Sequence, residues 1–348
     1  MRKGSTGSST TCRREPDELI IIAPNWLGDA VMATPLVRAI EERFPGARVA
    51  VACRRYVAAI FENGGGRRRL VVYGADGVRA RGAAVRRSRP TGGFDACLVA
   101  PPSFAAAIVS LASGAKRRIG YGGQWRSALL TDALPEADYR RGHLSRAYVA
   151  LLERLAGETI ADVPLPEVAP SDGWRGTVSR LCGDRSYCVL APGAAYGAAK
   201  VWPRLRYAEL ARRLAGTEGL AVFVVGGEAE RAEAERLASE AGAGARSLAG
   251  ALSLGELLAV LRGAAVVAGN DSGPVHAAAA LGAPTVAVFG PTSVEWTSPR
   301  GRAVRIVRAA AECAPCFRRE CPRGTLECLE RVSVEDVHRA VVSLLKGE

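Results

Sequence analysis

No apolar run in this 348-residue chain approaches the ~18 residues that a membrane-spanning helix needs. The first 14 residues are polar, rich in Ser and Thr and basic, so they lack the apolar core of a secretory signal. We therefore expect a soluble, cytoplasmic protein whose residues 1–17 form a disordered basic tail. The length leaves room for two domains, each with its own core.

Aromatic residues make up only 6% of the chain, which argues against a surface that stacks nucleic-acid bases. Positive charge, in contrast, is plentiful: the formal net charge is +12, and residues 1–170 hold 25 Lys and Arg against 16 Asp and Glu. Such a basic half indicates an anionic partner, which is nucleic acid, an acidic membrane surface or an acidic glycan. Lys116 to Arg118 is one of the basic clusters in this half. The alternative interpretation of any such cluster is a solvated surface without a partner.

Two familiar ligand motifs are also missing. The chain has no Gly-x-Gly-x-x-Gly loop of a dinucleotide fold and no Asp-x-Asp pair for a metal-bound sugar nucleotide. What it has is a repeated alternation of short apolar runs and helical patterns. The expected strands are 19–23, 48–53, 70–73, 95–100, 118–121, 187–191, 220–225, 264–268, 285–289 and 304–307. The expected helices are 30–43, 104–112, 144–156, 207–214, 229–241, 254–262, 277–280 and 333–346.

This alternation predicts an α/β protein with two doubly wound parallel-sheet domains that face each other across a cleft. We place the first domain at residues 18–170 and the second at 171–332, followed by a C-terminal helix over 333–348. The Pro-rich stretch Val163 to Asp172 is the expected linker.

The most informative stretch runs from Gly269 to His276, between an apolar run and an Ala-rich helical run. It is typical of a strand, a tight loop and a helix whose N-terminal amides can hold a phosphate. Asp271 or Ser272 would cap that helix, Ser272 and Gly273 would offer amides, and His276 would face the loop. A capped helix without a ligand is the alternative for this segment taken alone.

Other loops leave strands on the same side. Lys200 ends the loop that starts at Pro192, and Glu228 follows Gly226 and Gly227. Together they provide a cation for phosphate and a carboxylate for ribose hydroxyls. In the first half, Asp29 begins a helix after the first strand; it is either a helix-end charge or a general base facing the cleft.

These motifs in this order resemble glycosyltransferase family 9, the ADP-heptose:lipopolysaccharide heptosyltransferases, which have the GT-B fold. The motifs that carry the resemblance are Asn25 to Ala30 with Thr34 to Leu36, Pro192 to Pro203, Asn270 to Ala279 and Phe289 to Ser293. The cysteine segment 313–328 is most similar to the heptosyltransferase II members. The likeness extends from Leu19 to the end of the chain.

The resemblance implies an inverting transfer of L-glycero-D-manno-heptose from ADP-heptose to the first heptose of the lipopolysaccharide inner core. It implies that Asp29 is the general base and Lys200 the diphosphate lysine, with no cofactor required. Glu228 matches a ribose ligand, and the donor loop contains Asp271, Ser272, Gly273 and His276. Ala194 and Ala195 depart from the family pattern, so Tyr196 or backbone amides would contact phosphate there.

For the acceptor, a Kdo–lipid A inner core, we expect contacts from Asn25, Trp26, Lys116 and Arg118. The enzyme would touch the anionic inner face of the inner membrane without spanning it, and we expect no nucleic acid partner. Alternatives are a family member that acts on Kdo or uses another sugar nucleotide, and a non-catalytic binder of nucleotides or anionic glycans.

The cysteine segment carries Cys313, Cys316, Cys321 and Cys328, four thiols within 16 residues. This spacing is compatible with a structural zinc ion. Reduced thiols in a compact loop and an adventitious disulfide are the alternatives. Zinc is not the favoured one, because the chemistry of the family needs no metal.

Overall fold

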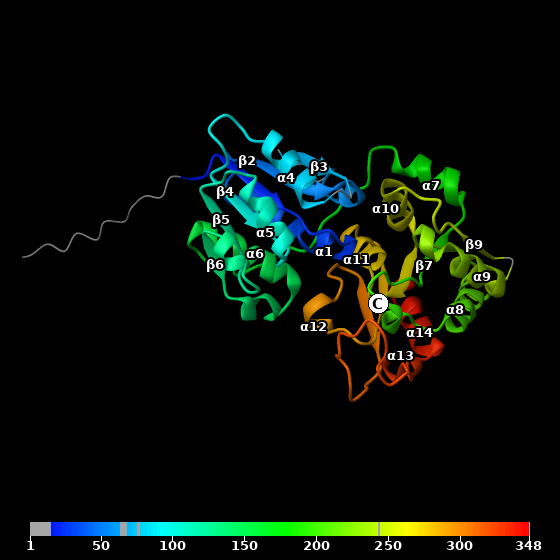
Figure 1. The fold of residues 1–348 in the computed structure, drawn as a ribbon. Coiled ribbons are helices and arrows are strands. Elements are labelled where there is room, and N and C mark those ends of the chain that lie inside the picture. The colour runs from blue at the N-terminus through cyan, green and yellow to red at the C-terminus, as the bar shows by residue number, and fades with distance from the viewer. Residues whose placement is uncertain (1–14, 63–67, 75–76, 243, 348) are drawn as a thin grey trace, which may run out of the picture.

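The computed structural model describes residues 15–62, 68–74, 77–242 and 244–347. The chain forms two lobes that meet at the middle of the molecule (Figure 1). Almost all of the predicted N-terminal tail lies outside the described residues. No helix in the described part of the chain is long and apolar enough to cross a bilayer.

The first lobe is built on a six-stranded parallel sheet of order β3-β2-β1-β4-β5-β6. Its strands are β1 (Glu18–Ile22), β2 (Arg48–Arg54), β3 (Arg69–Tyr73), β4 (Ala96–Val99), β5 (Arg117–Tyr121) and β6 (Asp132–Leu134). Its helices are α1 (Leu27–Met32), α2 (Thr34–Arg43), α3 (Ala59–Glu62), α4 (Val78–Arg87), α5 (Phe104–Leu111) and α6 (Leu144–Ala156). Short 3-10 turns are η1 (Arg55–Val57), η2 (Arg126–Leu129) and η3 (Glu136–Arg140).

The second lobe repeats this plan with the sheet order β12-β11-β10-β7-β8-β9, again parallel. Its strands are β7 (Tyr187–Ala191), β8 (Ala221–Val224), β9 (Ala245–Ser247), β10 (Val266–Asn270), β11 (Thr285–Phe289) and β12 (Val304–Arg308). Its helices are α7 (Trp174–Cys182), α8 (Arg204–Gly216), α9 (Arg231–Ala241), α10 (Leu254–Gly263), α11 (Gly273–Ala280), α12 (Val294–Thr297), α13 (Glu327–Glu330) and α14 (Val334–Leu345). Its 3-10 turns are η4 (Ala198–Lys200) and η5 (Glu228–Glu230).

Read from its first strand, each sheet has the doubly wound order 3-2-1-4-5-6. The order reverses between β1 and β4 in the first sheet and between β7 and β10 in the second. Loops that leave neighbouring strands at such a point diverge to opposite faces and open a crevice for ligands. The α/β class and the two parallel sheets predicted from the sequence are confirmed.

One predicted helix is divided in two. The pattern over 30–43 predicted a single helix, but α1 ends at Met32 and α2 starts at Thr34. Pro35 lies in the first turn of α2, where its missing N–H costs nothing, whereas inside a continuous helix it would break the hydrogen-bond ladder. The break confines α1 to six residues that reach toward the second lobe (Figure 1).

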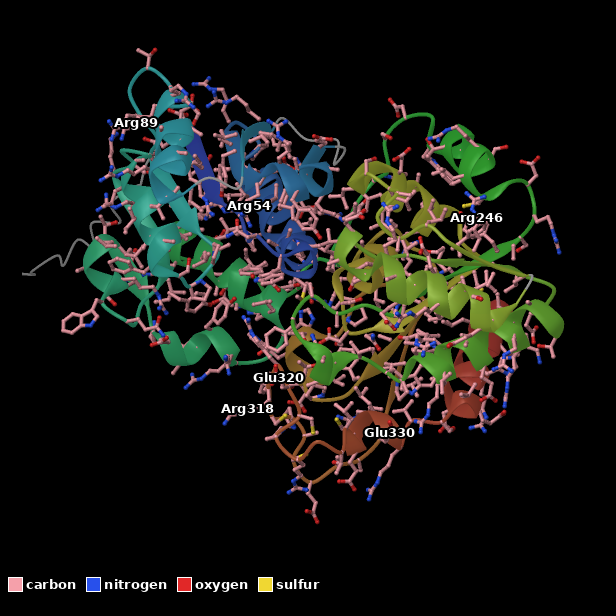
Figure 2. The ribbon with its side chains drawn as sticks, turned by 45° about the vertical axis from the view of Figure 1, so that its right-hand side comes forward. Arg54, Arg89, Arg246, Arg318, Glu320 and Glu330 are labelled. Carbon is pink, nitrogen blue, oxygen red and sulfur yellow. The ribbon has the colours of Figure 1, made fainter. Side chains whose placement is uncertain are left out.

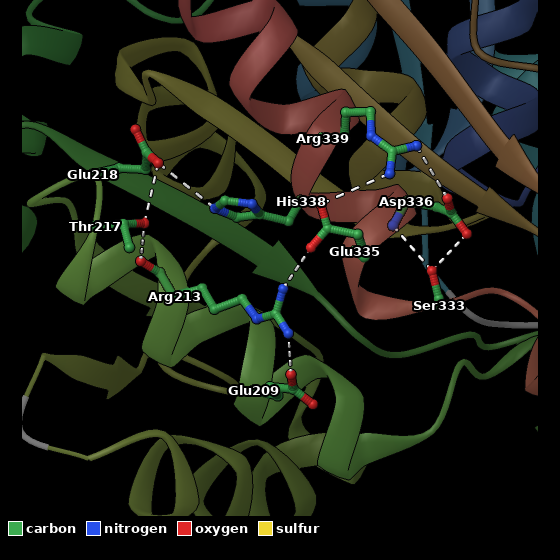
Figure 3. A network of polar contacts seen from close by, with 9 residues as sticks. All are labelled: Glu209, Arg213, Thr217, Glu218, Ser333, Glu335, Asp336, His338 and Arg339. Atoms are coloured by element: carbon green, nitrogen blue, oxygen red, sulfur yellow. Dashed lines mark hydrogen bonds and ion pairs between the residues drawn. The ribbon is translucent and has the colours of Figure 1, made fainter.

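The C-terminal helix α14 packs against the second lobe. Ser333 caps it through Asp336, and Arg213 of α8 bonds Glu335 as well as Glu209 of its own helix (Figure 3). On the apolar face of α14, Val337 and other aliphatic residues join the core of that lobe. The last helix is therefore an integral part of the second domain's packing.

Candidate active site

The helices α1 and α11 cross where the two lobes meet (Figure 1). The crossing needs glycine on both sides: a Cβ on Gly28 would lie 3.0 Å from His276, and one on Gly273 would lie 2.7 Å from Leu27. Both helices start at carboxyl ends of strands, α1 after β1 and α11 after β10. The first turn of each helix therefore faces the crevice between the domains.

Asp271, just before α11, is held by four side chains, the most distant of which is Thr297, whose Oγ1 donates to Oδ2 at 3.5 Å. Its Oδ2 accepts hydrogen bonds from Lys200 Nζ at 2.5 Å and from Thr292 Oγ1 at 2.7 Å. Its Oδ1 lies 3.2 Å from His276 Nε2. Burial alone would raise the pKa of Asp271, but the hydrogen bond with His276 and the charge of Lys200 outweigh it and hold the pKa well below its usual range. This buried carboxylate stays ionised and fixes its two basic neighbours.

Asp29 lies in the first turn of α1 and is only partly buried. Its carboxylate has no hydrogen bond or ion pair with the residues that the structure describes. Burial raises its pKa to about 6, and the nearby charges of His276 and Lys200 lower it only in part. Asp29 is therefore a carboxylate of the first domain within electrostatic reach of the two basic groups of the second.

Asn270 has a structural task. Its Oδ1 accepts from Trp202 N at 3.0 Å and from Tyr207 Oη at 2.9 Å, and its Nδ2 donates to the carbonyl of Pro192. The side chain is fully buried. It ties the end of β10 to both ends of the loop that carries Lys200, which explains why Lys200 reaches Asp271.

Several buried polar atoms beside the crevice lack a partner among the described residues: Asn25 Oδ1, Ser272 Oγ and Trp296 Nε1. Buried polar groups in proteins are almost always hydrogen-bonded, so each such atom calls for an explanation. Asn25 precedes α1, Ser272 is the N-cap of α11 without a side-chain cap bond, and Trp296 is in α12. A polar ligand bound beside α1, α11 and α12 would satisfy these atoms.

The two predicted donor residues outside this cluster have partners within the protein. Tyr196 Oη donates to the carbonyl of Phe317 at 2.7 Å, and Lys200 Nζ lies 5.4 Å from the centre of the Tyr196 ring. Glu228 is exposed and bonds Arg231 at 2.5 Å. Glu230, which the sequence pattern did not single out, lies closer to the donor loops, because its carboxylate occupies the space where a Gly193 side chain would be.

The fold separates the predicted acceptor residues. Asn25 and Trp26 stand at the carboxyl end of β1, beside the crevice, and Trp26 is exposed. Lys116 and Arg118 stand at the amino end of β5, where Lys116 pairs with Asp95 and Arg118 bonds the carbonyl of Leu129. Amino ends of parallel strands share the edge opposite the crevice, so the structure does not bring Lys116 and Arg118 to the site.

The cysteine segment 313–328 lies at the edge of the second lobe, where Arg318 and Glu320 project from it (Figure 2). Burial raises the pKa of Cys328, and the thiols of Cys313, Cys316 and Cys321 raise it further, so the four lie near one another. The eight described cysteines are free thiols. Across the described ranges no three His, Cys, Asp or Glu side chains are arranged to hold a metal ion, so zinc stays a hypothesis here.

Sequence reasoning gave no role to two functional candidates, Glu230 and Thr292, although Thr292 stands in the motif Phe289 to Ser293. Both follow strands of the second sheet at their carboxyl ends, β11 and β8. For Glu230 that position was the only signal, and carboxylates after strands are common.

Comparison with known proteins gives a consistent result. Residues 83–327 match the profile of Glycosyltransferase family 9 (heptosyltransferase). The chain is 30% identical to lipopolysaccharide heptosyltransferase 2 of Salmonella typhimurium, over 95% of this chain and 99% of that one. It is 31% identical to the Escherichia coli protein of the same name, over 84% and 88%. The solved structure of E. coli ADP-heptose lps heptosyltransferase II covers 95% of this chain and 99% of its own, with a TM-score of 0.80 and 26% identity.

Proposed function

The chain belongs to glycosyltransferase family 9, and from this premise we propose that it transfers L-glycero-D-manno-heptose from ADP-heptose to the first heptose of the lipopolysaccharide inner core. Its two facing parallel-sheet domains form the GT-B fold. The observation that carries the proposal is the position of Asp29, a carboxylate with a pKa of about 6 opposite the Lys200–Asp271–His276 cluster.

In this proposal the second domain binds the donor. The N-terminal amides of α11, at Gly273 and beside Ser272, bind the diphosphate together with Lys200. Asp271 acts through its neighbours, because its contacts with Lys200 and His276 orient both side chains beside the proposed diphosphate site. Glu228 is proposed as the ribose ligand and Tyr196 as a wall beside the phosphates.

The reaction is a single displacement with inversion. The acceptor hydroxyl attacks the anomeric carbon, its proton passes to Asp29, and the bond between that carbon and the ADP oxygen breaks. The diphosphate gains negative charge as it leaves, and Lys200 with the α11 amides stabilises that charge. A fixed cation and a helix end supply here what a metal supplies elsewhere, so we propose chemistry without a cofactor and expect activity to survive EDTA.

Incubation of the protein with ADP-heptose and each of two truncated acceptors tests this function. One acceptor ends at Kdo and the other at the first heptose, and released ADP and the extended glycan are measured. We expect extension of the heptose-ended acceptor only. Extension of the Kdo-ended acceptor would favour the alternative family activity, and ADP binding without any extension would favour a non-catalytic binder.

We also propose that the enzyme works in the cytoplasm and docks on the anionic inner face of the membrane through the first domain. Phe104, Ile108 and Leu111 are exposed on one face of α5. The arginine-rich helix α4 packs against α5, and Arg89, at the outer end of the domain in Figure 2, bonds the carbonyl of Ala112 at 2.7 Å. Apolar side chains next to arginines are the two signals that stable peripheral binding needs.

Vesicle sedimentation tests this docking. The protein should sediment with vesicles that contain anionic lipid and not with neutral ones. Ile108→Ser together with Leu111→Ser should weaken sedimentation about tenfold or more, since each loses buried apolar area. Equal binding of the double variant would place the membrane contact elsewhere.

A further inference from the structure

A cavity of about 340 Å³ opens in the first domain at the carboxyl ends of β4 and β5. Its walls are Pro102, Gln124, Arg126, Glu136, Ala137, Tyr139 and Arg140. The charge of Asp29 contributes to the raised pKa of Tyr139, so the cavity lies within electrostatic reach of the proposed base. The proposed donor chemistry uses none of these residues.

Arg140 is the most unusual group in this wall. Its guanidinium lies over two rings of the second domain, 4.9 Å from the centre of Trp296 and 5.4 Å from that of Phe317. It has no carboxylate partner in the described part of the chain. Stacking on rings keeps the guanidinium in place and leaves its N–H groups free to bind an anion.

A second guanidinium lies in the same wall. Arg126 is only 2% exposed and donates to the carbonyl of Tyr121 at 2.8 Å and to Glu136 at 3.1 Å. Glu136 is the single carboxylate among the lining residues, and its side chain is 55% exposed. Two guanidinium groups against one solvated carboxylate leave the cavity with net positive charge.

The backbone of this wall is held in an unusual conformation. Gln124 and Trp125 both have positive φ angles, 47° and 65°, in the left-handed region that side chains other than glycine disfavour. Such conformations cost free energy and concentrate at binding sites. Trp125, which lies between the lining residues Gln124 and Arg126, is also 91% exposed.

We propose that this cavity binds an anionic group of the acceptor glycan, a carboxylate or a phosphate, with Arg140 as its main ligand. The second domain contributes to this site, because its Trp296 and Phe317 rings hold the Arg140 guanidinium in place. The ring of Trp296 that packs against Arg140 also carries a buried Nε1 without a partner among the described residues. This inference rests on the proposed transfer to a lipopolysaccharide core.

The proposal also assigns a structural role to the cysteine segment. Phe317 belongs to that segment, and its N–H bonds the carbonyl of Pro291 at 2.8 Å while its carbonyl accepts from Tyr196. The segment thereby holds the Phe317 ring against Arg140 and ties it to the loop that carries Lys200. Acceptor binding and donor binding would then share one structural support.

The test compares Arg140→Gln with Arg141→Gln, a neighbour that pairs with Asp138 at the surface. Binding of the anionic core glycan is measured in the presence of ADP, beside the KM for each substrate. Loss of a charge-assisted bond should weaken acceptor binding about 10–100-fold. The affinity for ADP and the acceptor binding of Arg141→Gln should change less than about threefold, within the effect of a surface ion pair. Phe317→Leu should give a smaller loss of the same kind.

Two modified glycans identify the anion, one with its carboxylates reduced to alcohols and one dephosphorylated. If wild type and Arg140→Gln bind one of these modified glycans with equal affinity, the group removed from that glycan is the one that Arg140 recognises. Equal losses on every glycan, or no loss on the unmodified one, would overturn the subsite. Because binding is measured without turnover, an absence of transfer would contradict the proposed function and leave this test intact.

Discussion

Two aspartates stand at the reversals of strand order in the two domains and have opposite surroundings. Asp29 lies in the first turn of α1, which follows β1, and Asp271 precedes α11, which follows β10. Asp271 has a lysine, a histidine and two threonines around it, and its pKa is held below its usual range. Asp29 has no bonded partner among the described residues, and burial raises its pKa to about 6.

The contrast separates two tasks. A carboxylate locked in an ionic cluster orients other groups and accepts protons poorly. A carboxylate with a raised pKa accepts a proton near neutral pH, which is what a general base requires. The same residue type thus serves as an anchor in one domain and as the proposed base in the other.

The largest expected effect is on transfer. Asp29→Asn keeps the shape of the side chain and removes its basicity, so kcat should fall by about 10²–10⁴-fold. The Kd for ADP should stay within about threefold of the wild-type value, since Asp29 lies outside the domain that we propose binds the donor. Glu42→Gln, at an exposed position on α2, is the matched control and should keep full activity. Transfer by Asp29→Asn at a wild-type rate would remove it as the base.

Unfolding experiments sharpen the same comparison. Asp271→Asn leaves Lys200 buried without its counter-charge, so the free energy of unfolding at pH 7.5 should fall by about 3–5 kcal/mol. Asp29→Asn should raise it by about 1–3 kcal/mol. The folded-state pKa of Asp29 lies above its unfolded value, so the stability that its proton contributes is present below about pH 4 and is lost as pH rises through about 6. Changes of the same sign in the free energy of unfolding of the two variants would contradict the proposed difference between the two aspartates.

A smaller effect is expected where the domains touch. Gly273→Ala would place a Cβ 2.7 Å from Leu27 and push α1 away from α11. Such overpacking costs about 1–3 kcal/mol, and transfer should fall with it because Asp29 moves away from the donor. Gly255→Ala on α10 has open space around it and should be neutral or slightly stabilising.

The smallest expected effect concerns the ribose ligand. If Glu228 binds ribose, Glu228→Gln should weaken the affinity for ADP about tenfold, because one hydrogen bond to a charged group is lost. Glu230→Gln is the comparison, because Glu230 already bonds Gly227 N and lies beside Gly193. A loss confined to Glu230→Gln would move the ribose contact to that residue.

Sequence patterns predicted the fold well because buried parallel strands are short apolar runs. The run from Thr285 to Phe289 coincides with β11, and the Ala-rich stretch after Gly273 is α11. The pattern missed β6 and β9, which are three-residue strands at sheet edges. It also missed α4, whose glycine and four arginines give a weak apolar face.

The site was predictable only where one motif contains it. Gly269 to His276 identified Asp271, and Lys200 followed from its loop. Arg140 depends on rings more than 150 residues away in the chain, at Trp296 and Phe317, and no local pattern indicates such a contact. Lys116 and Arg118 show the converse, since a charge cluster in the sequence does not tell which end of a strand it occupies.

The pH dependence of kcat/KM tests the central claim most directly. With acceptor and ADP-heptose well below their KM, the wild-type enzyme should lose activity tenfold per pH unit below a bend near pH 6, where Asp29 takes up a proton. The residual activity of Asp29→Asn should show no such bend. A wild-type profile that stays flat from pH 7 down to pH 5 would contradict the assignment of Asp29 as the general base.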